Sequence, residues 1–144
     1  MSDTRQLLEF IYKNAQMGIQ TLPKLIEKAD NPQLIDSMTR QLAEYEEIVK
    51  TADTLIKNDE DYDNQALGGL SKFEKLTTDT MLAMNTMKDV SAGHIADMVI
   101  KGSSMGVKDI SEHMRGNAGA DTETLQLAER LRQTQQTNID EMQN

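Results

Sequence analysis

The sequence predicts an all-α protein that forms one domain over residues 1–144. Apolar residues recur at steps of three and four along most of the chain, which is the spacing of one helix face. No segment alternates apolar and polar residues as a half-buried strand does, and no hairpin turn signal occurs. A chain of 144 residues is also long enough to bury a substantial core without disulfide bonds.

The first two predicted helices cover residues 4–29 and 32–57. Asp3, with Gln6 three residues later, is typical of a helix start, and Asn31 followed by Pro32 is a favourable cap and first position for the second helix. The turn between them is so short that the helices must be antiparallel neighbours. Their apolar faces contain Leu8, Ile11, Ala15, Gly18, Leu22 and Leu25, and then Ile35, Met38, Leu42, Tyr45, Val49, Ala52 and Ile56.

Residues 58–90 are predicted to be a crossover between two halves of the domain. The segment begins with the acidic stretch NDEDYDNQALGG, and Ser71 with Glu74 then forms a possible capping box. A short helix is predicted over 71–88. Its apolar residues are predicted to lie at or beside a homodimer interface, because a four-helix core is already largely filled by the other helices; they are Phe73, Leu76, Met81, Met84 and Met87.

The last two predicted helices cover residues 92–115 and 122–142. Ser91 begins the first of them, the Gly-rich stretch RGNAGAD ends it, and Asp121 or Thr122 caps the second. One face of the first contains Ile95, Val99, Gly102, Gly106, Ile110 and Met114. The second has a more polar stripe that consists of Leu125, Ala128, Leu131, Gln135, Asn138 and Met142.

An internal repeat is indicated by two similar stretches, AQMGIQTL at 15–22 and SSMGVKDI at 103–110. Each lies in the middle of a predicted helix that turns sharply into a second helix. The pattern predicts two similar antiparallel hairpins, at about 4–57 and 91–142, related by a pseudo-twofold axis. Glycine at these points permits close approach of two helices, and methionine fills adjacent gaps; the residues assigned to these crossings are Met17, Gly18, Gly102, Met105 and Gly106.

Two helical hairpins joined by a long connection give the one-crossover topology of ferritin-like folds. The chain resembles the ferritin-like four-helix-bundle superfamily along nearly its whole length, and within it the small bacterial members without an assigned role. The second helix, with the sequence NPQLIDSMTRQLAEYEEIVKTADTLI, is similar to the second helix of ferritin-like spore-coat proteins. The resemblance implies a ferritin-like four-helix bundle of two repeated hairpins.

A ferritin-like fold raises the question of a di-iron site, which needs a Glu on each of two helices and Glu-x-x-His on the other two. Glu44 and Glu47 have the required spacing, but Glu47 stands in the place of histidine. Gln133 and Gln136 occupy the comparable part of the last helix, and the Met-Gly stretches offer only Gln16 and Ser104. We therefore predict no metal site and no cofactor. The residues that would serve if a site existed are Glu44, Glu47 and His113.

Other kinds of chemistry find no support in the residues. His94 and His113 are the two histidines, and neither has a nucleophile and an orienting acid at a credible spacing. Gly68-Gly69 lacks the lysine and the preceding strand of a phosphate-binding loop. Glu44, Glu46 and Glu47 with Lys50 are interpreted as a solvated helix face that carries charge pairs.

The amino-acid composition restricts the classes of partner and the cell compartment that are expected for the protein. The net charge of −9 disfavours nucleic acid and anionic membranes as partners. The absence of cysteine excludes disulfides and thiolate metal sites, and we find neither a secretion signal nor a membrane span. The prediction is a cytoplasmic, non-enzymatic bundle that acts through protein–protein contacts, as a homodimer or within a coat or stress-related assembly. The alternative is a degenerate metal-binding or redox member of the same superfamily.

Overall fold

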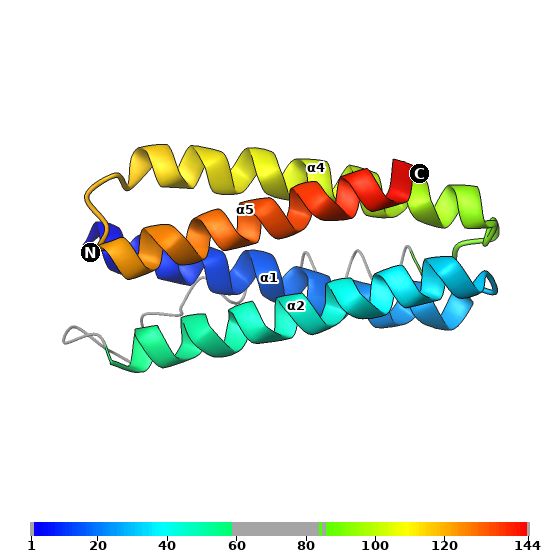
Figure 1. Ribbon diagram of the computed structural model, residues 1–144, viewed down its shortest axis with the longest axis horizontal. Helices are drawn as coiled ribbons and strands as arrows, with labels where there is room; N and C mark the ends of the chain where they lie inside the picture. The colour runs from blue at the N-terminus through cyan, green and yellow to red at the C-terminus, as the bar shows by residue number, and fades with distance from the viewer. Residues whose placement is uncertain (1, 59–83, 85, 144) are drawn as a thin grey trace.

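The computed structural model describes residues 2–58, 84 and 86–143, and these form four helices without any strand. The helices are α1 (Asp3–Lys28), α2 (Pro32–Lys57), α4 (Ala92–Gly116) and α5 (Thr122–Gln143) (Figure 1). The all-α prediction is confirmed, and each predicted end of these four helices lies within one residue of the observed end. Most of the helix predicted at 71–88 falls outside the described residues; of those described, Met84 is helical, whereas Met87 and Lys88 are not.

Side-chain caps explain why the first two helices begin where they do. Ser2, rather than Asp3, caps α1, because its hydroxyl accepts a hydrogen bond from the backbone N–H of Arg5 at 3.1 Å. The Asn31 side chain accepts from the N–H of Leu34 at 3.0 Å, and Pro32 is the first residue of α2. Such caps satisfy N–H groups that have no partner inside the helix.

The same device begins the second pair of helices. Ser91 accepts from the N–H of His94 at 3.3 Å at the start of α4. Asp121 accepts from the N–H of Thr124 at 2.9 Å at the start of α5, which resolves the choice between Asp121 and Thr122 in favour of the aspartate.

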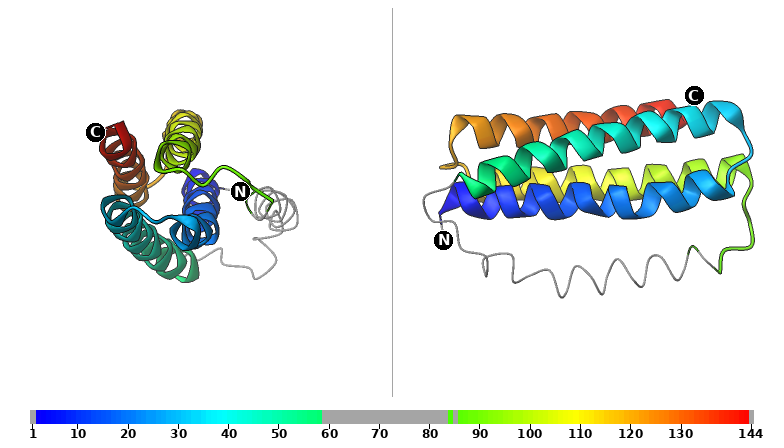
Figure 2. Two further views of the ribbon diagram at one scale, coloured as in Figure 1. Left: turned by 90° about the vertical axis from the view of Figure 1, so that its right-hand side faces the viewer. Right: turned by 90° about the horizontal axis from the view of Figure 1, so that it is seen from below.

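The four helices form two antiparallel pairs, α1 with α2 and α4 with α5 (Figures 1 and 2). Helix α1 also packs against α4 and α5, and α2 packs against α5. Helices α2 and α4 run in the same direction, so the chain between them joins opposite ends of the bundle. No helix in the described part of the chain combines the length and apolar character that a bilayer span needs.

The core follows the predicted stripes with shifts of one residue. On α2, Leu34, Gln41 and Ile48 are buried in place of Ile35, Leu42 and Val49, which are half-buried. The stripe on α4 shifts as well. Ser103, rather than Gly102, points inward there, and the buried positions are Ile95, Val99, Ser103, Gly106 and Ile110. Large aliphatic side chains from all four helices make up most of the core, and burying each one contributes about 1.5–3 kcal/mol. They include Leu7, Leu8, Ile11, Leu22, Leu25, Met38, Ile48, Ile56, Ile95, Val99, Ile110 and Leu131.

Part of the burial pattern of the first hairpin recurs in the second. On α2 and α5, six buried residues recur at a spacing of 90: Leu34 and Thr124, Ser37 and Leu127, Met38 and Ala128, Gln41 and Leu131, Tyr45 and Gln135, and Ile48 and Asn138. On α1 and α4, buried residues recur at a spacing of 88: Leu7 and Ile95, Ile11 and Val99, Ala15 and Ser103, and Leu22 and Ile110. The internal repeat and the pseudo-twofold superposition of the two hairpins stay predictions.

Candidate functional site

A cluster of neutral polar side chains lies inside the bundle, with members from all four described helices. We call it the central polar cluster; it consists of Asn14 on α1, Tyr45 on α2, Ser103 on α4, and Gln135 and Asn138 on α5. Four of the five residues are at most 6 % exposed, and Asn14 is half-buried. Buried polar groups in proteins are normally hydrogen-bonded, so their partners determine what such a cluster does.

Two hydrogen bonds across the cluster connect α5 to the first hairpin. Gln135 Nε2 donates to Asn14 Oδ1 at 2.7 Å, and Asn138 Nδ2 donates to the Tyr45 hydroxyl at 3.3 Å. Each bond contributes about 1 kcal/mol, but leaving a buried partner unsatisfied costs about 1–3 kcal/mol. The cluster therefore favours one specific alignment of α5 against α1 and α2.

Burial favours the neutral form of the Tyr45 phenol. Removal from water raises the pKa of Tyr45 above its ordinary value of 10.0, and the neighbouring side chains of Gln135, Asn138 and Ser103 oppose that rise. A neutral phenol both donates and accepts hydrogen bonds. At physiological pH the cluster thus contains amide and hydroxyl groups without a formal charge.

Two glycines let the large members of the cluster pack against helix backbone. A β-carbon at residue 18 would lie 2.6 Å from the ring of Tyr45, and one at residue 106 would lie 2.2 Å from Gln135 Nε2. Both distances are shorter than any ordinary contact between carbon and a heavy atom. Gly18 and Gly106 therefore stand at close approaches between the two helices of each hairpin.

The other residues assigned to these crossings differ from this pair. A β-carbon at Gly102 would meet nothing within 4 Å, so the structure does not bring Gly102 into a crossing; it lies on the outside of α4. Met105 is 59 % exposed and does not fill a gap beside Gly106, whereas Met17 is half-buried. Adjacent helical residues point about 100° apart, which is why Met105 faces away while Gly106 faces inward.

The three metal-ligand candidates do not form one site, because Glu44 and Glu47 lie one turn apart on α2 while His113 lies on α4. Glu44 forms an ion pair across helices with Arg130, at 2.7 Å between Oε1 and Nε, and Glu47 is exposed. His113 stacks on Phe10, with ring centroids 3.5 Å apart, and its Nδ1 lies 2.9 Å from the Asp109 carbonyl oxygen. Within residues 2–58, 84 and 86–143, no three His, Asp or Glu side chains form a group that could hold a metal ion.

The polar pair that faces the interior has the spacing considered in the sequence but a different register. On α5 it is Gln135 and Asn138, rather than Gln133 and Gln136, and the matching positions on α2 are Tyr45 and Ile48. The candidate positions Glu44, Glu47, Gln16 and Ser104 therefore lie one or two residues away from the side chains that face the interior. Asn14 and Ser103 were missed. In the sequence, each of these two residues is only a small polar residue next to an apolar stripe. Many surface positions have the same pattern, so it does not identify a buried residue.

The predicted interface residues that are described contact their own chain. Met84 is 2 % exposed and belongs to the hydrophobic core, and Met87 packs against that core. Met84 is therefore covered by its own chain and is not available to a partner, whereas the interface predicted at Met87, which is half-buried, stays a prediction. Phe73, Leu76 and Met81 lie outside the described residues.

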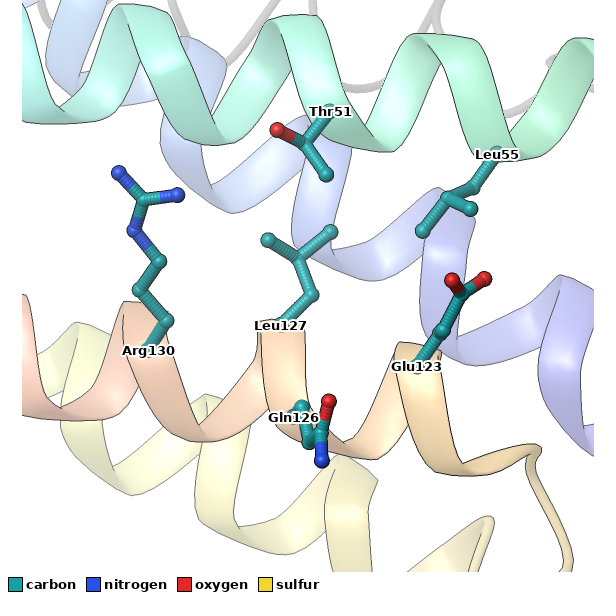
Figure 3. Close-up of a pocket in the computed structure, with 6 residues that line it drawn as sticks. All are labelled: Thr51, Leu55, Glu123, Gln126, Leu127 and Arg130. Carbon is teal, nitrogen blue, oxygen red and sulfur yellow. The ribbon is translucent and has the colours of Figure 1, made fainter.

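A shallow depression on the surface lies between α2 and α5 (Figure 3). Thr51 and Leu55 point into it from α2, and Leu127 rises toward them from α5. Arg130 and Glu123 stand on either side of Leu127, so an apolar floor is bordered by one positive and one negative group.

Comparison of the chain with protein-family models, with curated proteins and with solved structures gave no match.

Proposed function

We propose that the protein is a ferritin-like bundle without enzymatic activity that acts through contacts with other proteins, including a second copy of itself. The observation that carries this proposal is the central polar cluster, in which neutral amide and hydroxyl groups fill the middle of the bundle. Such groups suit a fixed alignment of the helices. The charged side chains Glu44 and Arg130 pair at the surface instead.

The directions of the helices support the ferritin-like part of the proposal. Helices α2 and α4 run in the same direction, and the chain between them joins opposite ends of the bundle. One such crossover between two antiparallel hairpins is the connectivity of ferritin-like bundles.

The surface of the described residues supports a role in protein contact. Met105 and Val90 are large apolar residues that are 59 % and 41 % exposed. Methionine adapts its shape to varied partners. The depression between α2 and α5 adds a second surface with an apolar floor.

Self-association is tested by light scattering of the whole chain at micromolar concentration. We expect a native mass above that of a monomer, and a lower mass for Met105→Asp. Ser104→Asp is the matched control, because it adds the same charge at the neighbouring exposed position. A native chain that stays monomeric contradicts self-association, and a dimer unaffected by Met105→Asp places the interface elsewhere.

The metal-binding alternative is tested by elemental analysis of protein purified without chelators. We expect no stoichiometric iron, manganese or zinc. One or more metal ions per chain that are lost in the double variant Glu44→Ala, Glu47→Ala, but kept in the control Glu46→Ala, would replace this proposal with the alternative.

A further inference from the structure

The outer face of α4 carries side chains that the single chain does not use. Helix α4 packs mainly against α5 and α1, and its opposite face lies on the outside of the bundle (Figure 2). Met105 lies on that face and, at 59 %, is the most exposed large apolar residue among those described. Removing an apolar side chain of this size from water is favourable, so this face is suited to contact with another molecule.

Gly102 lies on the same face, and the fold of a single chain gives no reason for a glycine there. A β-carbon at residue 102 would meet nothing within 4 Å, whereas one at residue 106 would collide with Gln135. Glycine destabilises the interior of a helix relative to alanine, so Gly102 has a cost and no benefit in the monomer. Because glycine lets another backbone come close, Gly102 suits a crossing with a helix from outside the chain.

Asp97 and Lys108 stand on either side of Gly102 at nearly equal distances along the helix, and they carry opposite charges. They are eleven residues apart, which is close to three helical turns, so the two side chains leave the same side of α4. Both are exposed, and neither forms an ion pair within the described part of the chain. Each charge is therefore available to a partner.

This pattern is complementary to itself in an antiparallel pair of helices. A twofold axis near Gly102 places Asp97 of one copy opposite Lys108 of the other, and the symmetry forms this pair twice because both copies use the same surface. The two copies of Lys101 come near each other beside the axis, but the long flexible stem lets their ammonium groups point apart. A parallel pair would instead place each charge opposite its own copy, which is unfavourable.

We propose that two copies of this chain associate through the outer faces of their α4 helices, antiparallel about a twofold axis near Gly102, with Asp97 of each copy paired with Lys108 of the other. Met98 of one copy then packs against Met105 of the other, which covers the most exposed apolar side chain. The inference rests on the self-association in the proposed function and adds to it the surface, the direction of the helices and their register.

Exchange of the two charges tests the register by sedimentation equilibrium of the whole chain. Asp97→Lys sets lysines against each other at both ends of the contact, and we expect the dissociation constant of the dimer to rise by about tenfold or more. The double variant Asp97→Lys, Lys108→Asp restores opposite charges and should return the dissociation constant to within about threefold of the native value. Glu46→Lys is the control, because it makes the same change in charge at an exposed position on α2.

The change in net charge works against the expected result, which makes the test specific. The native chain has a net charge of −9, so replacing an acidic residue with lysine reduces the general repulsion between two copies. Glu46→Lys should therefore leave the dimer unchanged or tighten it, whereas Asp97→Lys should weaken it. Equal effects of these two variants, or a double variant as weak as Asp97→Lys, would overturn the proposed register.

Cysteine crosslinking tests the position of the axis. The native chain has no cysteine, so Gly102→Cys introduces one thiol, which lies beside its own copy across the axis and within the reach of a disulfide. Gly93→Cys is the matched control, because Gly93 is also an exposed glycine of α4 whose β-carbon would meet nothing within 4 Å. With an added thiol oxidant, we expect Gly102→Cys to crosslink at least about tenfold faster, and equal rates would contradict the axis.

The two measurements separate this inference from the proposed function. A native chain that stays monomeric at micromolar concentration contradicts self-association and this surface together. A native dimer that fails both the charge exchange and the crosslinking test keeps self-association and overturns only the pairing of the α4 helices.

Discussion

Tyr45 lies flat against the backbone of α1 at Gly18, so that a β-carbon at residue 18 would come within 2.6 Å of its ring. The equivalent residues of the second hairpin repeat this relationship with different chemistry, because Gln135 lies against Gly106. In both hairpins a long side chain from the second helix occupies the space that a glycine leaves on the first. This contact sets the separation of the helices at the level of the central polar cluster.

Gly18→Ala is therefore expected to destabilise the protein by about 1–3 kcal/mol, because the new methyl group overpacks against a buried ring. Gly102→Ala is the matched control on α4. Its β-carbon meets nothing within 4 Å, so better helix propensity should stabilise the protein by up to about 1 kcal/mol. Urea unfolding of both variants measures the difference, and equal effects would contradict the close approach at Gly18.

Stability is expected to fall as the pH rises above 10, partly because of Tyr45. Its folded-state pKa is raised above the ordinary value of 10.0, so the unfolded chain loses this proton first and is favoured as the pH increases. This loss of stability is absent below pH 10.0. Above that value, the free energy of unfolding falls by at most about 1.4 kcal/mol per pH unit. Tyr45→Phe should flatten this part of the profile, whereas an unchanged slope would show that the phenol ionises freely in the folded protein.

Glu129 is expected to titrate at unusually low pH. Hydrogen bonds from Arg132, and to a smaller extent from Gln133, lower the pKa of Glu129 to about 2 from its ordinary value of 4.5. Because the folded pKa is lowered, any stabilisation is present above pH 4.5 and is lost as the pH falls toward 2. The Glu129 side chain is 43 % exposed, so the effect on stability should be small. NMR titration of its carboxyl carbon in native protein and in Arg132→Gln checks the prediction; a midpoint that Arg132→Gln leaves unchanged would refute it.

Substitution by glutamate should destabilise the protein at one methionine and leave its stability almost unchanged at another. Met84→Glu places a carboxylate at a position that is 2 % exposed, and we expect a loss of at least about 3 kcal/mol. Met84→Leu keeps the volume and should cost less than about 1.5 kcal/mol. Met105→Glu alters a residue that is 59 % exposed and should change the stability of the monomer by no more than about 0.5 kcal/mol. Thermal unfolding at low protein concentration separates the three, and a tolerated Met84→Glu would place Met84 outside the core.

The sequence by itself determined the four described helices and their pairing into hairpins. The reason is local. The helix starts depend on capping residues that act on backbone groups within one turn, which are Asn31 with Pro32 for α2 and Ser91 for α4. Apolar residues at helical spacing define the buried faces. The very short turn between α1 and α2 then leaves only an antiparallel arrangement. These signals do not depend on contacts with distant parts of the chain.

Only the tertiary structure decided which polar side chains pair across the interior. Tyr45, Gln135 and Asn138 stand on the predicted stripes, but the hydrogen bonds from Gln135 to Asn14 and from Asn138 to Tyr45 join helices that are far apart in the sequence. The same holds for Gly102 and Gly106, which belong to one predicted stripe although only Gly106 stands at a close approach. Successive residues on a helix are rotated by about 100°, and an apolar stripe is about equally wide. The stripe alone therefore does not say which of two adjacent residues points inward. The side chains that face the helix from the other helices set its final orientation.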